Sequence, residues 1–230
     1  MVKLQGPELH PEHKEITSLV VMLHGFGADG QDLIGLAPCF SQPLPNTVFH
    51  APDGAQPCEI SPFGRQWFSL AQSDPEYLRR NAETQDIAFE GMYDEACKAA
   101  GPIENYIDSL MEDYQLHSNQ VALVGFSQGT MMALHIGLRR TSPFACIVGF
   151  SGALVGASHL AAEKQADCPV LLVHGEADDM LPVRAVDLAA EGLKQAGVSP
   201  QVIKRPGLPH AIDEVGTIGC ANFLRTHLQA

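Results

Sequence analysis

The chain has 230 residues, of which 45% are hydrophobic and 18% are charged, a balance typical of one globular domain. Its formal charge of -13 at pH 7, without a basic cluster, excludes nucleic acid and anionic membrane surfaces as expected partners. The six cysteines are scattered, which predicts reduced thiols. No apolar run approaches the ~20 residues that span a bilayer, so we expect no stable membrane insertion and a cytoplasmic location.

Short β-branched runs alternate with longer stretches of helical spacing along the whole chain. This alternation is typical of an α/β fold, in which a mostly parallel central sheet is flanked by helices on both faces. We therefore expect a single α/β domain over residues 1–230. The predicted strands cover residues 16–23, 47–50, a run ending at 124, 144–150, 169–175 and 200–205. The first predicted helix begins near residue 31, and the others cover about 83–100, 103–114, 128–140, 183–196 and 211–229. Gly101-Pro102 is expected to separate the second helix from the third.

Residues 52–82 contain several prolines and the only tryptophan of the chain, Trp67. A segment of this length is too long for a plain connection between a strand and a helix. Long ordered loops in compact domains are often lids or binding loops, so we expect one of these roles here.

The sequence Gly125-Phe-Ser127-Gln-Gly129 matches the G-x-S-x-G pattern. It follows a β-branched run and precedes a helix, so the glycines would allow a sharp strand-to-helix turn that exposes the serine. Ser127 is therefore the candidate nucleophile. The alternative is a serine that only caps the following helix.

A serine hydroxyl needs a base and a third group that orients the base. In hydrolases of this type the acid and then the histidine follow the nucleophile along the chain. Asp178 lies just after the strand at 169–175, with Asp179 beside it as a competitor, and both aspartates could instead form a turn. His210 lies in a loop after the last predicted strand, whereas His227 lies in the terminal helix. Asp178 and His210 are thus the predicted acid and base.

Two further histidines, His24 and His174, each precede a glycine at a strand end. We expect them to be structural residues near the site. The oxyanion of an acyl-transfer intermediate needs hydrogen-bond donors, commonly one backbone amide after the nucleophile and one after an early strand. These donors would be the backbone amides of Gln128 and Phe26.

The early loop also supports a rival function, because Gly25, Gly27 and Gly30 form G-x-G-x-x-G after a strand. Asp53 follows about 20 residues later, as in a dinucleotide-binding Rossmann unit. Against this, Asp29 would place a carboxylate where a pyrophosphate must bind. A third possibility is a non-catalytic hydrolase-fold binding protein, which keeps the pocket without turnover.

Five segments in order resemble the phospholipase/carboxylesterase family of the α/β-hydrolase fold, which includes acyl-protein thioesterases and bacterial carboxylesterases. They are VVMLHGFGADGQDL, APDG with GRQWFSL, VGFSQGTMMAL, HGEADDMLPV and GLPHAID. Asp179 departs from the pattern, since the family usually has proline there. The charged stretch 71–82 makes the bacterial branch the closer one.

This resemblance implies a serine carboxylesterase that uses Ser127, Asp178 and His210, with an oxyanion hole formed by Phe26 and Gln128. It further implies that an acyl pocket is lined by three apolar residues, Trp67, Phe68 and Leu181. The expected substrate is a small-molecule ester or thioester, or a lysophospholipid, and no metal or organic cofactor is expected, since no H-E-x-x-H spacing occurs. Association into a homodimer stays open.

Overall fold

A computed structural model of the protein describes residues 3–12, 15–71 and 77–228. Its main sheet has the strand order β1-β3-β2-β6-β7-β8-β9. Only β1 is antiparallel to its neighbour, and the other neighbouring pairs are parallel, which confirms the predicted mostly parallel sheet. The strands are β1 (Glu8–Leu9), β2 (Ser18–Leu23), β3 (Thr47–His50), β6 (Val121–Phe126), β7 (Cys146–Phe150), β8 (Val170–Gly175) and β9 (Gln201–Arg205).

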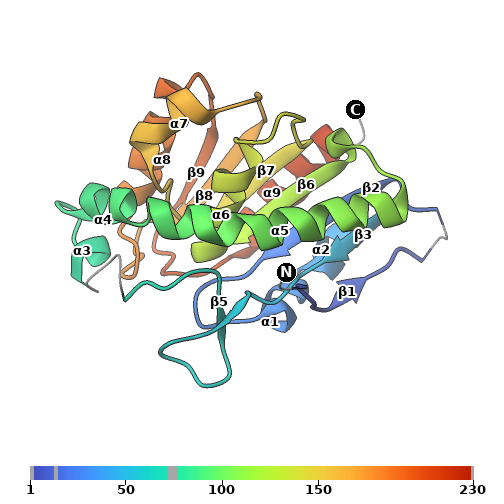
Figure 1. The fold of residues 1–230 in the computed structure, drawn as a ribbon, viewed down its shortest axis with the longest axis horizontal. Helices are drawn as coiled ribbons and strands as arrows, with labels where there is room; N and C mark the ends of the chain where they lie inside the picture. Colours follow the sequence, from blue (N-terminus) through green and yellow to red (C-terminus); the bar gives the residue numbers. More distant parts are fainter. Residues whose placement is uncertain (1–2, 13–14, 72–76, 229–230) are drawn as a thin grey trace.

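Helices cover both faces of the sheet, as the α/β pattern predicts (Figure 1). Successive side chains of a strand point to opposite faces, so Leu19, Val21 and Leu23 of β2 pack in one core layer while Val20 and Met22 pack in the other. The first layer includes residues of α4 (Gln85–Gly91), α5 (Tyr93–Tyr114), α6 (Gln128–Gly137), α7 (Ala157–Glu163) and α8 (Arg184–Gln195). The second includes residues of α1 (Gly30–Ile34), α2 (Ala37–Ser41) and α9 (Glu214–Leu228).

The predicted helix break at Gly101-Pro102 is wrong. Helix α5 continues through Pro102, and the chain instead breaks at Met92, between α4 and α5. Proline removes the hydrogen bond to the carbonyl four residues earlier, here that of Lys98, an exposed residue where water can take the place of the missing donor. Buried side chains on both sides of Pro102 then hold the helix against the core: Ala96, Ile103, Ile107 and Leu110.

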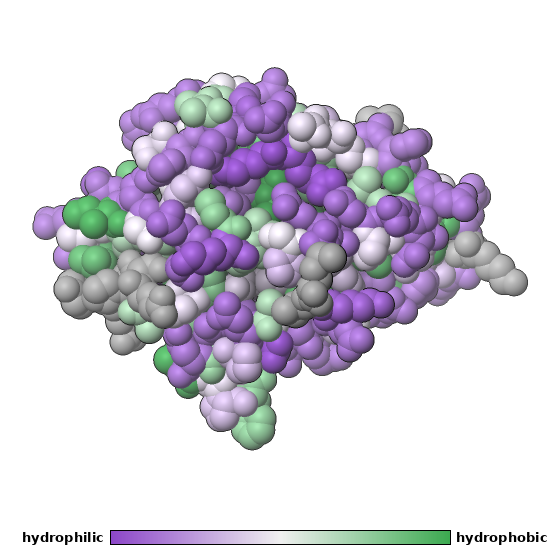
Figure 2. Space-filling view, viewed as in Figure 1, coloured by the Kyte–Doolittle hydropathy of each residue, from purple (hydrophilic) through white to green (hydrophobic). Residues whose placement is uncertain are grey.

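The loop at 52–82 contains a short hairpin, β4 (Gln56–Pro57) and β5 (Arg65–Gln66), that projects from the body of the molecule (Figure 1). Near its tip Ile60 and Phe63 are exposed, and the projecting lobe is visible in Figure 2. Its base is bonded to the loop after β2, since the Gly27 amide donates to Arg65 O and the Arg65 amide donates to Ala28 O. Residues 72–76 lie outside the described part of the chain, so the lid interpretation stays a prediction. Helix α3 (Tyr77–Arg80) follows them.

Candidate active site

Ser127 lies on the sharp turn between β6 and α6, with φ 53° and ψ -116°. This is a strained backbone conformation for a residue other than glycine. A Cβ on Gly129 would lie 1.8 Å from the carbonyl oxygen of Leu23, and one on Gly125 would lie 2.5 Å from backbone atoms of Gly129. Only glycine fits at either position, so the two glycines of the motif allow the turn to pack against the sheet.

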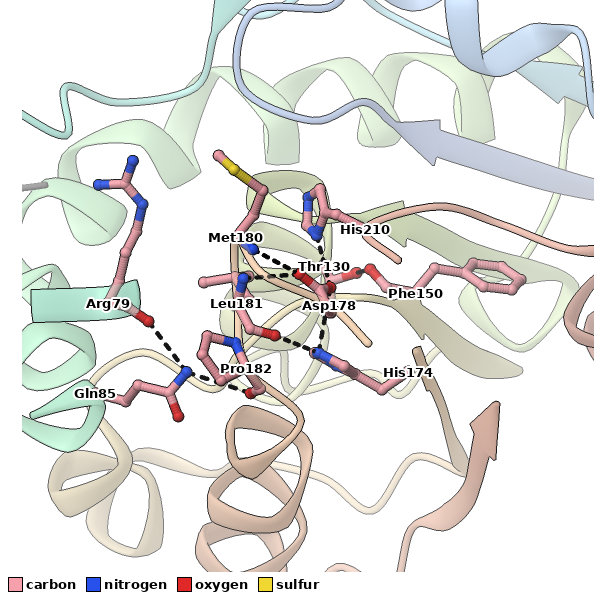
Figure 3. Close-up of polar contacts among 10 residues, drawn as sticks. All are labelled: Arg79, Gln85, Thr130, Phe150, His174, Asp178, Met180, Leu181, Pro182 and His210. Atoms are coloured by element: carbon pink, nitrogen blue, oxygen red, sulfur yellow. Dashed lines mark hydrogen bonds and ion pairs between the residues drawn. The ribbon is translucent and has the colours of Figure 1, made fainter. Parts of the chain in front are cut away.

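Asp178 and His210 come from the loops that follow β8 and β9, and the parallel sheet brings them together. His210 Nδ1 lies 2.7 Å from Asp178 Oδ2 (Figure 3). Because Nδ1 faces the carboxylate, the other ring nitrogen, Nε2, is left for a reaction partner. The His210 ring also packs against Phe126, the residue before Ser127, with ring centroids 4.9 Å apart.

The carboxylate of Asp178 is buried and held on both oxygens. Its Oδ1 accepts hydrogen bonds from the amides of Met180 (3.0 Å) and Leu181 (2.8 Å). Burial by itself would raise the pKa of Asp178, but the hydrogen bonds from His210 and the Leu181 amide outweigh it and keep that pKa below its ordinary value. The adjacent Asp179 is exposed. The geometry therefore favours Asp178 over Asp179 as the partner of His210.

His24 and His174 are both buried and bonded to the backbone, as expected of structural residues. His24 Nε2 accepts a hydrogen bond from the Gly54 amide at 2.9 Å. His174 Nε2 lies 2.8 Å from Leu181 O and 3.4 Å from Asp178 Oδ2. His174 thus supports the loop that carries the aspartate.

Ser127 and His210 line one cavity of about 140 Å³. Within the described residues the Ser127 hydroxyl makes no hydrogen bond, so the structure joins His210 to Asp178 but not to Ser127. Hydrogen bonds of this kind are often long in unliganded enzymes and shorten when substrate binds. A substrate in this cavity could contact both residues, because both line it.

The two predicted oxyanion donors both line this cavity, one in the loop after β2 and the other at the start of α6. In that loop the amides next to Phe26 are engaged, since Gly27 donates to Arg65 O and Ala28 donates to Gly25 O. No bond of the Phe26 amide occurs within the described residues. Gln128 is the first residue of α6, where a backbone amide has no partner inside the helix.

The three residues predicted to line an acyl pocket lie in two different places. Leu181 lines the cavity, whereas the side chains of Trp67 and Phe68 are buried in the core and are not part of the lining. The Trp67 indole donates to His24 O at 2.9 Å, and that bond turns the ring inward. Both residues support the site through packing.

Sequence reasoning missed several other residues of the lining, because their spacing is that of ordinary helix and loop positions. They come from the hairpin loop, α3, α6 and the loop after β8: Leu70, Arg79, Met131 and Met180. Gln85 Nε2 links two of these segments, since it donates to Arg79 O at 3.1 Å and Pro182 O at 3.3 Å (Figure 3). The lining is thus assembled from distant parts of the chain.

The dinucleotide alternative does not fit the structure. Asp29 caps α1 by accepting from the Asp32 amide at 3.0 Å, and Asp53 Oδ1 accepts from the Gly30 amide at 2.9 Å. Both acidic side chains therefore occupy the helix N-terminus, where a pyrophosphate would need free amide groups. The glycine pattern belongs to the turn that carries Phe26.

A mostly parallel sheet, a serine on a strained strand-to-helix turn and a His–Asp pair from later loops define the α/β-hydrolase class. Comparison with known proteins agrees. The chain belongs to the phospholipase/carboxylesterase family, whose model matches residues 4–228, and it is a serine hydrolase acting on ester bonds.

Individual relatives cover nearly the whole chain. Acyl-protein thioesterase 1 of Gibberella zeae is 28% identical over 97% of this chain and 96% of that protein. Esterase YpfH of Escherichia coli is 24% identical over 87% of this chain and 78% of that protein. The crystal structure of esterase PE8 is 36% identical, with a TM-score of 0.88 over 99% of this chain and 100% of that chain. Within the described residues, no helix has the length and apolar character needed to span a bilayer.

Proposed function

We propose that the protein is a carboxylesterase in which Ser127 is the nucleophile, His210 the general base and Asp178 the residue that orients it. The observation that carries the proposal is the 2.7 Å contact between His210 Nδ1 and Asp178 Oδ2, beside the cavity that Ser127 and His210 share. We further propose that residues 1–230 act as one domain, which the family match over residues 4–228 supports.

The proposed reaction has two acyl-transfer steps. His210 Nε2 takes the proton of Ser127 as its Oγ attacks the ester carbonyl, and the leaving alcohol or thiol then takes that proton as the bond to the acyl carbon breaks. A water molecule, deprotonated by the same nitrogen, then attacks the acyl-enzyme, and His210 gives that proton to Ser127 Oγ as the bond to the acyl carbon breaks and the acid is released. Asp178 remains ionised throughout and stabilises the imidazolium, in keeping with its lowered pKa.

The backbone amides of Phe26 and Gln128 are proposed to bind the oxyanion in both steps. Amides that are already fixed by a turn and a helix start need no reorganisation when charge develops. The α6 N-terminus adds a partial positive charge beside the same oxygen.

The proposed substrate is a small ester, with thioesters and lysophospholipids as alternatives that share the same acyl-transfer step. Relatives named as an esterase and as an acyl-protein thioesterase support this class. Drug-sized ligands occupy pockets of roughly 300–1,000 Å³. A cavity of about 140 Å³ next to Leu181 therefore favours a short acyl group.

The test is rapid labelling by a fluorophosphonate probe, followed by peptide mass mapping. Such probes phosphonylate only an activated serine, so we expect label on Ser127 and none in Ser127→Ala or His210→Ala. Both variants should keep the wild-type circular dichroism spectrum, because neither residue fills the core. A folded wild-type protein that binds ester analogues without being labelled would instead favour the non-catalytic binding protein.

A further inference from the structure

Three ligand-type side chains meet at the β1–β3 edge of the sheet, outside the lining of the proposed active site. Glu8 is paired with His50 in the antiparallel ladder between these strands. His10 follows Glu8 by two residues, which is the spacing that keeps side chains on one side of an extended chain. Glu8 and His10 are exposed, and His50 is buried.

The distances from Glu8 to the two histidines are close to those between the ligand atoms of a metal site. His10 Nε2 lies 3.1 Å from Glu8 Oε1, and His50 Nε2 lies 3.5 Å from Glu8 Oε2. One ligand atom from each residue falls within 4.8 Å of the others. In a tetrahedral zinc site with bonds of 2.0–2.2 Å, ligand atoms are about 3.4 Å apart. The three groups thus need only small side-chain adjustments to share one ion.

We propose that Glu8, His10 and His50 bind a divalent first-row transition metal, with Zn²⁺ as the expected ion. Two imidazoles and one carboxylate are a common zinc ligand set, and water would complete the tetrahedron. A set with two imidazole nitrogens disfavours Mg²⁺ and Ca²⁺, which prefer oxygen ligands. The formal charge of -13 also favours the approach of a cation.

The surroundings of His50 are those of an oriented metal ligand. The Tyr106 hydroxyl lies 3.1 Å from His50 Nδ1 and can hold the ring so that Nε2 faces Glu8. The Tyr114 hydroxyl lies 2.9 Å from Nε2 and would be displaced by the ion. Tyr114 is partly exposed, so its hydroxyl can turn to solvent. A cavity of about 820 Å³ is lined by Glu8, His50 and Tyr106 and gives water a path to the site.

The ion would fasten the N-terminal segment to the sheet. That segment already pairs with the residues after β3, since the Ala51 amide donates to Pro7 O and the Asp53 amide donates to Gln5 O. Because β1 has only two residues, a metal shared by β1, His10 and β3 would add a strong link at this edge. Metal binding to the folded state only should raise its stability.

The experiment is calorimetric titration of the chelator-treated full chain with Zn²⁺, with Glu8→Gln and His10→Ala as variants. Both side chains are exposed, so the variants should fold as the wild type does. We expect one ion per chain in the wild type and affinity at least about tenfold weaker in each variant. Glu12→Gln and His117→Ala change exposed residues of the same types and should bind as the wild type does.

Two further measurements complete the test. With Zn²⁺ at about 100-fold excess over the wild-type Kd, the melting temperature of the wild type should rise by roughly 5–10 °C, and that rise should be smaller in Glu8→Gln and His10→Ala. The spectrum with Co²⁺ should lack the thiolate charge-transfer band, because the proposed ligands include no thiolate. Cys39 and Cys97 are exposed and are the competing ligands, and Co²⁺ bound to either would give that band. No binding by the wild type, wild-type affinity in Glu8→Gln or His10→Ala, or a thiolate band would each overturn the proposal.

Discussion

The side chain of Gln128 ties the nucleophile turn to the backbone of Trp67. Its Oε1 accepts a hydrogen bond of 3.0 Å from the Trp67 amide, and its Nε2 donates one of 2.9 Å to the Phe68 carbonyl. Gln128 is buried, so water is a poor substitute for either bond. The residue after Ser127 thus has two separate roles, with its backbone amide in the proposed oxyanion hole and its side chain holding the loop that contains Trp67.

Gln128→Met should keep the side-chain volume and the backbone amide but leave two buried backbone groups without partners. We expect a loss of about 2–6 kcal/mol in the free energy of unfolding, since each of the two unsatisfied groups costs about 1–3 kcal/mol. Urea denaturation measures this loss. Gln195→Met, at an exposed position on α8, is the control and should change stability by less than about 0.5 kcal/mol. Equal stability of Gln128→Met and wild type would contradict the structural role.

Asp178→Asn and Asp179→Asn should differ sharply in activity. The first change removes the carboxylate that faces His210 Nδ1 and favours the wrong imidazole tautomer, so kcat should fall by roughly 10³–10⁴-fold. The second alters an exposed side chain and should change kcat by no more than a few-fold. Steady-state hydrolysis of p-nitrophenyl acetate distinguishes them. The reverse order of effects would move the acid to Asp179.

Substrate chain length should be limited by the cavity beside Leu181. We expect kcat/KM for p-nitrophenyl esters to be highest for acetate and butyrate and to fall for longer acyl groups, because the cavity is only about 140 Å³. Leu181→Ala should shift the optimum to longer chains. Leu160→Ala, at a buried position on α7 outside the cavity lining, should lower stability without moving the optimum. An unchanged chain-length profile in Leu181→Ala would argue against this pocket.

His135 should make stability depend on pH. Burial, together with the nearby Arg139 charge, lowers the pKa of His135 to about 4. The unfolded chain, with a histidine pKa near 6.5, then binds more protons than the folded protein between these values, so stability rises with pH from about 4 to 6.5. This residue alone should contribute about 3 kcal/mol over that range.

The non-titrating variant His135→Gln isolates this contribution. Urea denaturation of both proteins at several pH values should give a flatter profile for the variant between pH 4 and 6.5. Comparison at pH 7 and above removes any constant difference caused by packing. Parallel profiles for the two proteins would show that His135 takes up its proton without cost to folding.

The order of strands and helices could be predicted because each has its own local signal. Alternation of strand and helix periods gave a mostly parallel sheet, and β2 begins within two residues of the predicted strand. The error at Gly101-Pro102 arose because proline weakens a helix locally, whereas packing along both halves of α5 decides whether the helix continues.

Part of the candidate site could also be predicted from the sequence. A serine between glycines after a strand, and an aspartate and a histidine after later strands, are local patterns whose meeting follows from a parallel sheet, because the carboxyl ends of its strands lie at one edge. The sequence alone therefore determined the fold class and the three candidate residues of the site.

Only the tertiary structure could distinguish Asp178 from the adjacent Asp179 and show where the side chains lie. It paired His210 with Asp178 and left Asp179 exposed, turned Trp67 into the core, and brought Glu8 and His10 to His50 across the sheet edge. These results depend on burial and on contacts between residues far apart in the chain. Such contacts are set by how whole layers pack and leave no fixed spacing in the sequence.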